Sequence, residues 1–129
     1  MLARMIPLAL VAAVAIGGCA APQRAARPAY ISHIVFASLI EPLDRAELIA
    51  DSEARLATIP SVVSFAAGEH IDTGRDTVLA DYDVGIYLGF ASVEGLAEYV
   101  AHPRHIAFVR DWGPRVRSLR VYDVADPTP

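Results

Sequence analysis

The sequence predicts an α+β domain in which four strands form one antiparallel sheet and the helices cover one of its faces. Three observations lead to this prediction. Strand-like and helix-like segments follow one another in the order βαββαβ, the strands are apolar on both faces, and each helix carries one apolar stripe. With 129 residues, the chain is long enough for one ordinary domain and too short for two.

The elements are placed by apolar periodicity and by the residues that start or stop a helix or strand. Strands are expected over residues 30–40, 62–71, 82–91 and 117–124, and helices over residues 44–59, 92–101 and 103–112. The turn-forming residues of 72–81 predict a loop able to lie over a pocket. This order is the split-βαβ or ferredoxin-like arrangement, with one extra short helix before the last strand.

Two helix starts carry capping signals. Asp44, with Glu47 three residues later, matches a helix N-cap and its reciprocal acid, and Ser92 precedes the second helix. Apolar residues at spacings of three, four and seven predict which side of that second helix faces the sheet. They are Val93, Leu96, Ala97 and Val100. Tyr99 is expected at the edge of this stripe.

Residues 98–108 gather two of the four histidines around a proline. Pro103 cannot donate to the preceding helical ladder and moves His102 out of the helical region, so one helix should end at this corner and another should begin with Pro103. On the new helix His105 shares one face with three large apolar residues. These are Phe108, Val109 and Trp112. His105 is therefore either a core side chain or the acid/base group of a pocket.

The sheet is expected to be apolar on the face that the helices leave uncovered, through residues such as Phe36 and Phe65. A bare apolar face of this size predicts a second sheet packed against it. The one cysteine lies near the N-terminus, so the domain is expected to be held by its core or by a partner rather than by disulfides. A homodimer is the simplest source of the second sheet.

The N-terminal segment predicts export from the cytoplasm. Arg4 precedes an apolar run over residues 6–16. As a helix this run would reach roughly 16 Å, about half of the hydrocarbon core of a bilayer. This is the length of the apolar part of a signal peptide rather than of a membrane span.

The end of this run predicts a lipid anchor. Ile16-Gly17-Gly18-Cys19 resembles the lipobox of bacterial lipoproteins, in which the cysteine is lipidated and becomes the first residue of the mature chain. The resemblance implies a signal peptide over residues 1–18 and a tether over 19–29, with the domain on the extracytoplasmic, periplasmic side of the bacterial cell envelope. Plain secretion, with a cut near Ala20 or Ala21, is the alternative.

Four stretches of the predicted domain carry a family resemblance. They are His33-Ile34-Val35-Phe36, Ile59-Pro60-Ser61-Val62-Val63, Tyr82-Asp83-Val84 and Tyr99-Val100-Ala101-His102-Pro103-Arg104-His105. Together they resemble the stress-responsive α/β-barrel (Dabb) family, whose members are ferredoxin-like domains that pair sheet to sheet into dimeric barrels. The resemblance covers residues 30–124, and 125–129 form a tail. One member type, a plant polyketide cyclase, has a catalytic tyrosine and histidine that match Tyr99 and His105.

The sequence offers one candidate site. The cyclase resemblance implies catalytic roles for His105 and Tyr99, because an aldol step needs a base for a carbon acid and a donor beside the enolate. Four further residues are expected to line the pocket. They are His33, Tyr87, Phe108 and Trp112. The alternative is that the tyrosine and histidine only join the helix corner to the sheet by hydrogen bonds.

The composition argues against several other functions. Eleven arginines against fifteen acidic residues, without a run of like charge, make nucleic acid a poor partner. The remaining two histidines and two loop aspartates do not have the spacing of a metal site, so no metal is expected. These positions are His70, His102, Asp72 and Asp76. Because the sequence has no Gly-rich phosphate loop and no Gly-x-Ser-x-Gly turn, we also expect no cofactor.

Two classes of function remain. The first is a lipid-anchored dimeric module that binds a small apolar or aromatic ligand or serves a stress-related role, and it is favoured because an anchored enzyme would lack cytoplasmic precursors. The second is an acid–base enzyme of the cyclase or isomerase kind that uses His105 and Tyr99 on a small carbonyl or phenolic compound. A dimeric-barrel monooxygenase is a third possibility. An open pocket lined by these two residues and Trp112 would favour the enzyme.

Replacing Cys19 by alanine tests the anchor. A cysteine that carries two or three acyl chains is held firmly at a membrane, because each buried methylene contributes roughly 0.8 kcal/mol. Cys19→Ala should therefore release the protein from the membrane fraction or stall its processing, as measured by fractionation and by the mass of the mature chain. A Cys19→Ala protein that matures normally and stays on membranes would contradict the anchor.

Overall fold

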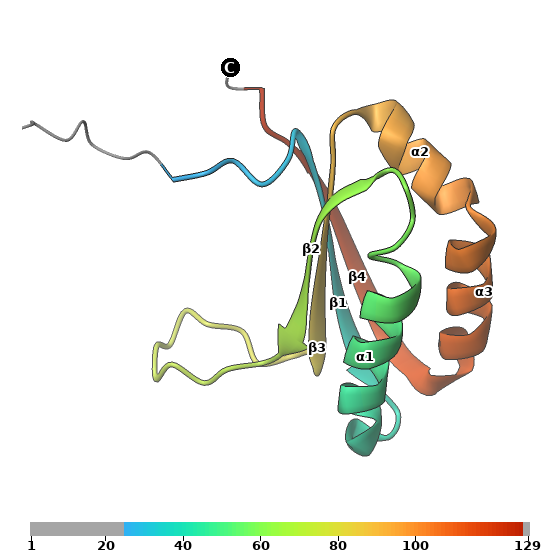
Figure 1. The fold of residues 1–129 in the computed structure, drawn as a ribbon. Helices are drawn as coiled ribbons and strands as arrows, with labels where there is room; N and C mark the ends of the chain where they lie inside the picture. Colours follow the sequence, from blue (N-terminus) through green and yellow to red (C-terminus); the bar gives the residue numbers. More distant parts are fainter. Residues whose placement is uncertain (1–24, 128–129) are drawn as a thin grey trace, which may run out of the picture.

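The computed structural model describes residues 25–127, which form a four-stranded antiparallel sheet covered on one face by helices (Figure 1). The elements in chain order are β1 (Ile31–Leu39), a 3₁₀ turn (Pro42–Asp44), α1 (Arg45–Arg55), β2 (Val62–Glu69), β3 (Val84–Phe90), α2 (Val93–Ala101), α3 (Pro103–Trp112), a second 3₁₀ turn (Gly113–Arg115) and β4 (Val116–Ala125). The strand order is β2-β3-β1-β4. This confirms the predicted ferredoxin-like α+β fold. The expected signal peptide, Cys19 and part of the tether lie outside the described residues.

The register of the central strands defines the two faces of the sheet. β1 pairs with β3 through His33 opposite Leu88, and with β4 through His33 opposite Asp123. Alternate side chains of β3 point toward the helices and are buried, because successive residues of a strand point to opposite faces. They are Val84, Ile86, Leu88 and Phe90. The hydrophobic core therefore lies between this face and the helices.

The two phenylalanines expected on the uncovered face lie on opposite faces. Phe65 of β2 pairs with Leu88 and packs against the buried core, so it points toward the helices. Phe36 of β1 lines a shallow hollow on the uncovered face. Phe65 faces the helices because the register of β2 shifts near the start of the strand. This shift is not apparent from the strand's own sequence. The prediction for Phe65 is therefore wrong.

The capping signals behave differently at the two helix starts. At α2 the Ser92 hydroxyl accepts a hydrogen bond from the Gly95 amide at 3.1 Å, as predicted. At α1 the Asp44 side chain makes no capping bond and instead accepts a hydrogen bond from Arg115 Nε at 3.0 Å. Glu47 also binds Arg115, at 3.0 and 2.6 Å. A guanidinium is a stronger partner for a carboxylate than a neutral amide is, so the two acids join α1 to the start of β4.

Helices α2 and α3 meet at the predicted proline corner. His102 adopts extended backbone angles (φ −69°, ψ 136°), and its Nδ1 accepts a hydrogen bond from the Arg104 amide at 3.1 Å. The buried side of α2 differs from the predicted stripe, since Val93 and Val100 are exposed and Tyr99 is the side chain that the helix buries. The large ring of Tyr99 reaches the space above β1 and β3, which the shorter valine side chains do not fill.

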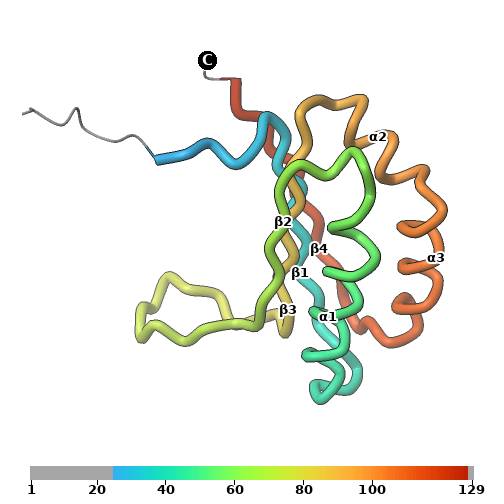
Figure 2. The backbone as a smooth tube through the Cα atoms, in the orientation of Figure 1, coloured from blue at the N-terminus to red at the C-terminus, as the bar shows by residue number. Residues whose placement is uncertain are grey.

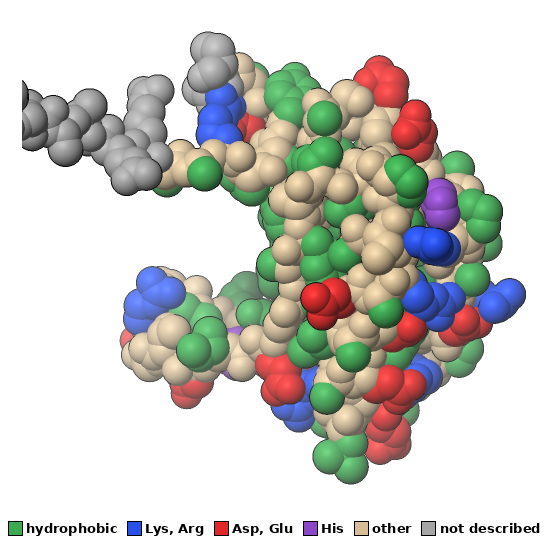
Figure 3. Space-filling model, in the orientation of Figure 1, with side chains coloured by type: hydrophobic (Ala, Val, Ile, Leu, Met, Phe, Trp, Pro, Cys, Tyr) green, Lys and Arg blue, Asp and Glu red, His purple; other side chains and the backbone are tan. Residues whose placement is uncertain are grey.

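The uncovered face of the sheet is hollowed and flanked by two projecting segments (Figures 1 and 3). The segment before β1 projects at one end and the loop between β2 and β3, residues 70–83, at the other, as the tube drawing also shows (Figure 2). The loop turns at Gly74, whose φ of +67° suits glycine. Large apolar side chains are exposed on this face and on the loop. They include Ile71, Leu79, Tyr122 and Val124.

Candidate functional site

A cavity of about 530 Å³ lies between the helices and the sheet, where α3 faces β1 and β4. Its walls are mainly aliphatic and aromatic side chains, and its volume is typical of a pocket for a small organic ligand. The cavity brings together five of the six residues that the sequence assigned to the site. They are His33, Tyr99, His105, Phe108 and Trp112.

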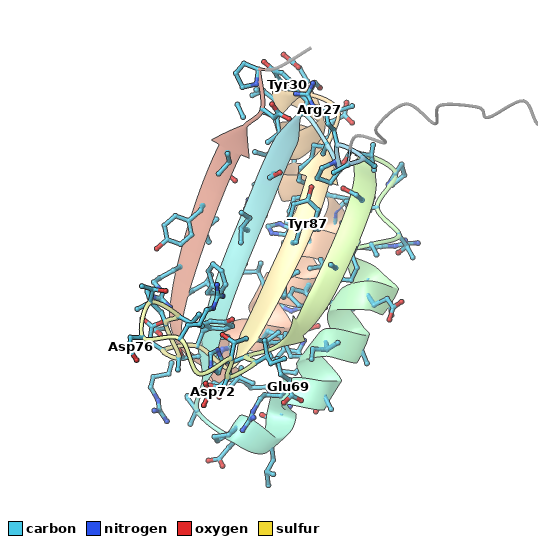
Figure 4. The ribbon with its side chains drawn as sticks, turned by 90° about the vertical axis from the view of Figure 1, so that its left-hand side faces the viewer. Arg27, Tyr30, Glu69, Asp72, Asp76 and Tyr87 are labelled. Carbon is cyan, nitrogen blue, oxygen red and sulfur yellow. The ribbon has the colours of Figure 1, made fainter. Side chains whose placement is uncertain are left out.

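The sixth residue, Tyr87, lies on the other face of the sheet, where its side chain points away from the helices (Figure 4). Its neighbours in β3, Ile86 and Leu88, line the cavity, and adjacent residues of a strand point to opposite faces. The Tyr87 hydroxyl lies 3.4 Å from the hydroxyls of Ser32 and Ser64. Tyr87 is therefore not a wall of this pocket.

Polar contacts hold α3 against α1 rather than against β4. Trp112 Nε1 donates a hydrogen bond to Asp51 Oδ2 at 2.7 Å. Arg55 links Asp51 to Asp111, with a distance of 3.0 Å to each carboxylate. The Arg115 guanidinium lies over the Trp112 ring, 3.9 Å from its centroid. These contacts fix the indole as one wall and leave the space between α3 and β4 to the cavity.

His105 lines the cavity and has one unprotonated ring nitrogen. Its Nδ1 lies 3.0 Å from the carbonyl oxygen of Val100, and because a carbonyl only accepts, Nδ1 carries the proton. In the neutral ring Nε2 is therefore an acceptor. Burial lowers the pKa of His105, and nearby His33 lowers it further, whereas the bond to Val100 opposes the shift. The lowered pKa keeps the ring neutral at neutral pH, as a general base requires.

Tyr99 lies beside His105 with its hydroxyl free. The two ring centroids are 4.5 Å apart, and the rings are tilted by 50°. The Tyr99 side chain is buried, yet within residues 25–127 its hydroxyl has no hydrogen-bond partner. Burial raises the pKa of Tyr99 well above its ordinary value. The phenol therefore stays protonated and is available as a donor to a ligand.

Sequence reasoning missed one member of this polar group, Asp123 near the end of β4. The strands pair it with His33, whose Nδ1–H donates to Asp123 Oδ1 at 2.6 Å. Because an ionised carboxylate only accepts, Nδ1 of His33 carries the proton of this bond. The His33 ring is 5.8 Å from the Tyr99 ring. Only the strand register reveals the pair, since the two residues are 90 positions apart.

The cavity opens beside β4, and several exposed side chains of its rim are apolar. Four rim side chains are between 45% and 56% exposed. They are Val100, Val109, Leu119 and Val121. An apolar rim favours a ligand that is itself mainly apolar, because entry does not require polar groups of the protein to lose water.

The remaining histidines and loop acids lie outside the cavity. His102 caps α3, and the His70 ring contacts Tyr82 at 5.4 Å between centroids. Asp72 and Asp76 lie on the loop between β2 and β3 (Figure 4). In the part of the chain that the structure describes, no three His, Cys, Asp or Glu side chains are grouped as metal ligands. The helices of that part are also too short or too polar to cross a bilayer.

The fold and the cavity define a small ferredoxin-like α+β domain with one ligand-sized apolar site. The model of the stress responsive A/B barrel domain family (Dabb) matches residues 31–126. The chain therefore belongs to this family. No protein with curated annotation matches the sequence.

Solved structures share the fold over almost their whole length. A Dabb family protein from Mesorhizobium loti is 28% identical, with a TM-score of 0.65 over 76% of this chain and 97% of that one. A dimeric ferredoxin-like protein from Thermobifida fusca is 20% identical, with a TM-score of 0.62 over 74% and 90% of the two chains. A hydroxynitrile lyase from Passiflora edulis is 17% identical, with a TM-score of 0.66 over 80% and 99%. The last two show likeness of fold alone.

The lowered pKa of His105 predicts that stability depends on pH. The ring takes up a proton less readily in the folded chain than in the unfolded chain, where its pKa is about 6.5. The unfolded state therefore gains more protons as the pH falls, and the free energy of unfolding should decrease from about pH 7 to about pH 5. His105→Gln should flatten this decrease. Urea unfolding at several pH values measures this free energy. An equal decrease with pH in the wild-type protein and in His105→Gln would contradict the prediction.

Proposed function

We propose that the cavity binds a small ring compound with a carbonyl or phenolic group and catalyses proton transfer on it. The main support is the pair formed by His105 and Tyr99 at a ligand-sized apolar cavity, one with a free acceptor nitrogen and the other with a free hydroxyl. A filled interior would favour a purely structural role for both side chains. The open volume of about 530 Å³ favours the acid–base alternative.

The roles of the two residues follow from their protonation. Neutral His105 accepts, at Nε2, a proton from a carbon beside the carbonyl of the ligand. The electron pair left behind moves onto the carbonyl oxygen, which receives a hydrogen bond from the Tyr99 hydroxyl. Where a double bond adjoins that carbon, the imidazolium returns the proton to the far carbon of the dienolate, which moves the double bond into conjugation and isomerises the ligand. In an aldol ring closure it returns the proton to the new alkoxide instead.

His33 and Asp123 orient the ligand in this proposal. The carboxylate holds the His33 ring in the tautomer that leaves Nε2 as an acceptor beside Tyr99. A phenolic hydroxyl of the ligand can donate to that nitrogen. This second polar contact fixes which carbon of the ligand meets His105, and orientation of this kind is a large part of catalysis.

We also propose that the protein is a homodimer whose uncovered sheet faces meet, and that Cys19 anchors it in the bacterial envelope. The hollowed apolar face supports the dimer, as does the description of the Thermobifida fusca protein of the same fold as dimeric. The anchor is supported by the N-terminal sequence, where the single cysteine follows a short apolar run.

Hydrogen exchange on a ring ketone tests the acid–base proposal. The wild-type protein should speed the exchange of the α-hydrogens of tetralone in D₂O, followed by NMR. His105→Gln keeps the size of the side chain but removes the base, and it should lower the rate gain by about a hundredfold or more. Tyr99→Phe should cause a smaller loss, because it removes only the donor to the enolate oxygen.

His102→Asn is the matched control for this exchange assay. Asparagine retains the capping of α3, and His102 has no contact with the cavity, so the exchange rate should stay at the wild-type value. The proposal fails if the wild-type protein exchanges tetralone no faster than buffer and binds no ring compound.

Two phenylalanines distinguish the proposed dimer surface from the core. Phe36→Asp puts a charge on the uncovered face and should yield a folded monomer, whereas Phe65→Asp buries an unpaired charge in the core and should cost several kcal/mol of unfolding free energy. Leu43→Asp, at a side chain that is 94% exposed, is the control. Sedimentation at micromolar concentration measures the assembly. A fully folded wild-type monomer would rule out the dimer.

A further inference from the structure

The lining of the cavity contains one permanently charged side chain, Arg117. No aspartate or glutamate is among the described residues that form the walls. Arginine is the residue that cannot lose its charge in a protein, whereas the histidines of the cavity can be neutral. The net charge of the walls is therefore positive, and its permanent part lies where β4 begins.

Arg117 has no acidic partner in the part of the chain that the structure describes. Its guanidinium donates one hydrogen bond, to the carbonyl of Ile40 at 3.3 Å. The arginines on either side of it along the chain, Arg115 and Arg120, are both paired with carboxylates. Most N–H groups of Arg117 are thus available to a ligand, and no carboxylate within residues 25–127 competes for them.

Arg117 and the His33–Asp123 pair lie at opposite ends of the cavity. Arg117 lies beside the irregularity where β4 shifts against β1 near Leu39. At the other end of β4, Asp123 pairs with His33, which lies near Tyr99. The six residue steps from 117 to 123 span about 20 Å of strand. A ligand that reaches both ends is therefore elongated, and its middle lies against the aliphatic walls.

We propose that Arg117 binds an anionic group of the ligand. This inference rests on the proposed function and specifies its substrate class: an elongated, mainly apolar compound with a carboxylate or similar oxyanion at one end and the reacting carbonyl or phenol at the other. A guanidinium binds a carboxylate through two parallel hydrogen bonds, which fixes orientation as well as adding affinity. A cationic ligand would be repelled by Arg117, and no carboxylate among the lining residues would offset this repulsion.

The test uses two probes with the same phenylalkyl chain, phenylhexanoate with a charged end group and phenylhexanol with a neutral one. Trp112 is the one tryptophan of the chain and forms a wall of the cavity, so its fluorescence reports binding there rather than on the uncovered face. Titrations of the full chain give a Kd for each probe. Arg117→Gln should raise the Kd of phenylhexanoate about tenfold, and should change the Kd of phenylhexanol by less than about twofold, because the alcohol has no charge to pair.

Two further variants separate charge from structure. Arg117→Lys should recover part of the lost affinity, because it retains the positive charge. Arg75→Gln is the matched control, since Arg75 also has no acidic partner within residues 25–127 but lies on the loop away from the cavity. Arg75→Gln should leave both Kd values unchanged. Added salt should weaken binding of phenylhexanoate alone.

The outcomes distinguish this inference from the function on which it rests. If both probes bind and Arg117→Gln affects them equally, or affects neither, the anion site is overturned while the pocket stands. If neither probe changes the fluorescence of Trp112 in the wild-type chain, the ligand-binding function is overturned together with the anion site. A loss confined to phenylhexanoate, with partial recovery in Arg117→Lys, supports the anion site.

Discussion

The break between α2 and α3 at Pro103 determines where the polar side chains of the site lie. On one continuous helix, residues 99 and 105 would be about 120° apart around the axis and would face different sides. Because Pro103 has no N–H and forces His102 into an extended conformation, the chain turns between them. The Tyr99 and His105 rings then approach to 4.5 Å between centroids. The proline corner is thus a requirement of the site as well as a connection between helices.

The cavity depends on a second constraint, the attachment of α3 to α1. Protein interiors are close-packed, and unfilled space lined by apolar side chains reduces stability. Here the bonds from Trp112 to Asp51 and from Arg55 to Asp111 hold α3 in place without β4. The position of α3 therefore does not depend on packing against β4. A large space maintained in this way supports the proposed ligand site rather than a packing defect.

The order of the elements could be predicted because it depends on neighbouring residues. The site could be predicted only in part, because it depends on the register between strands that are far apart in the sequence. The Ser92 cap and the Pro103 corner depend on a few neighbouring residues, and the structure has both where the sequence predicted them. The Asp123–His33 pair and the face occupied by Phe65 depend on which strands pair and in which register. A strand's own sequence contains no information on either. Tyr87 shows the same limit, because alternation places it opposite Ile86 and Leu88 but does not indicate which of the two faces the helices cover.

The two faces of the sheet separate the cavity from the surface of the proposed assembly. In β3, Ile86 and Leu88 face the cavity and Tyr87 faces the proposed partner, so adjacent residues serve different roles. β4 is an edge strand with exposed apolar side chains on both faces: Val121 at the rim of the cavity and Tyr122 on the uncovered side. Pairing or packing along an edge orders the strand and both sets of its side chains. β4 is therefore the element through which a second sheet would act on the mouth of the cavity.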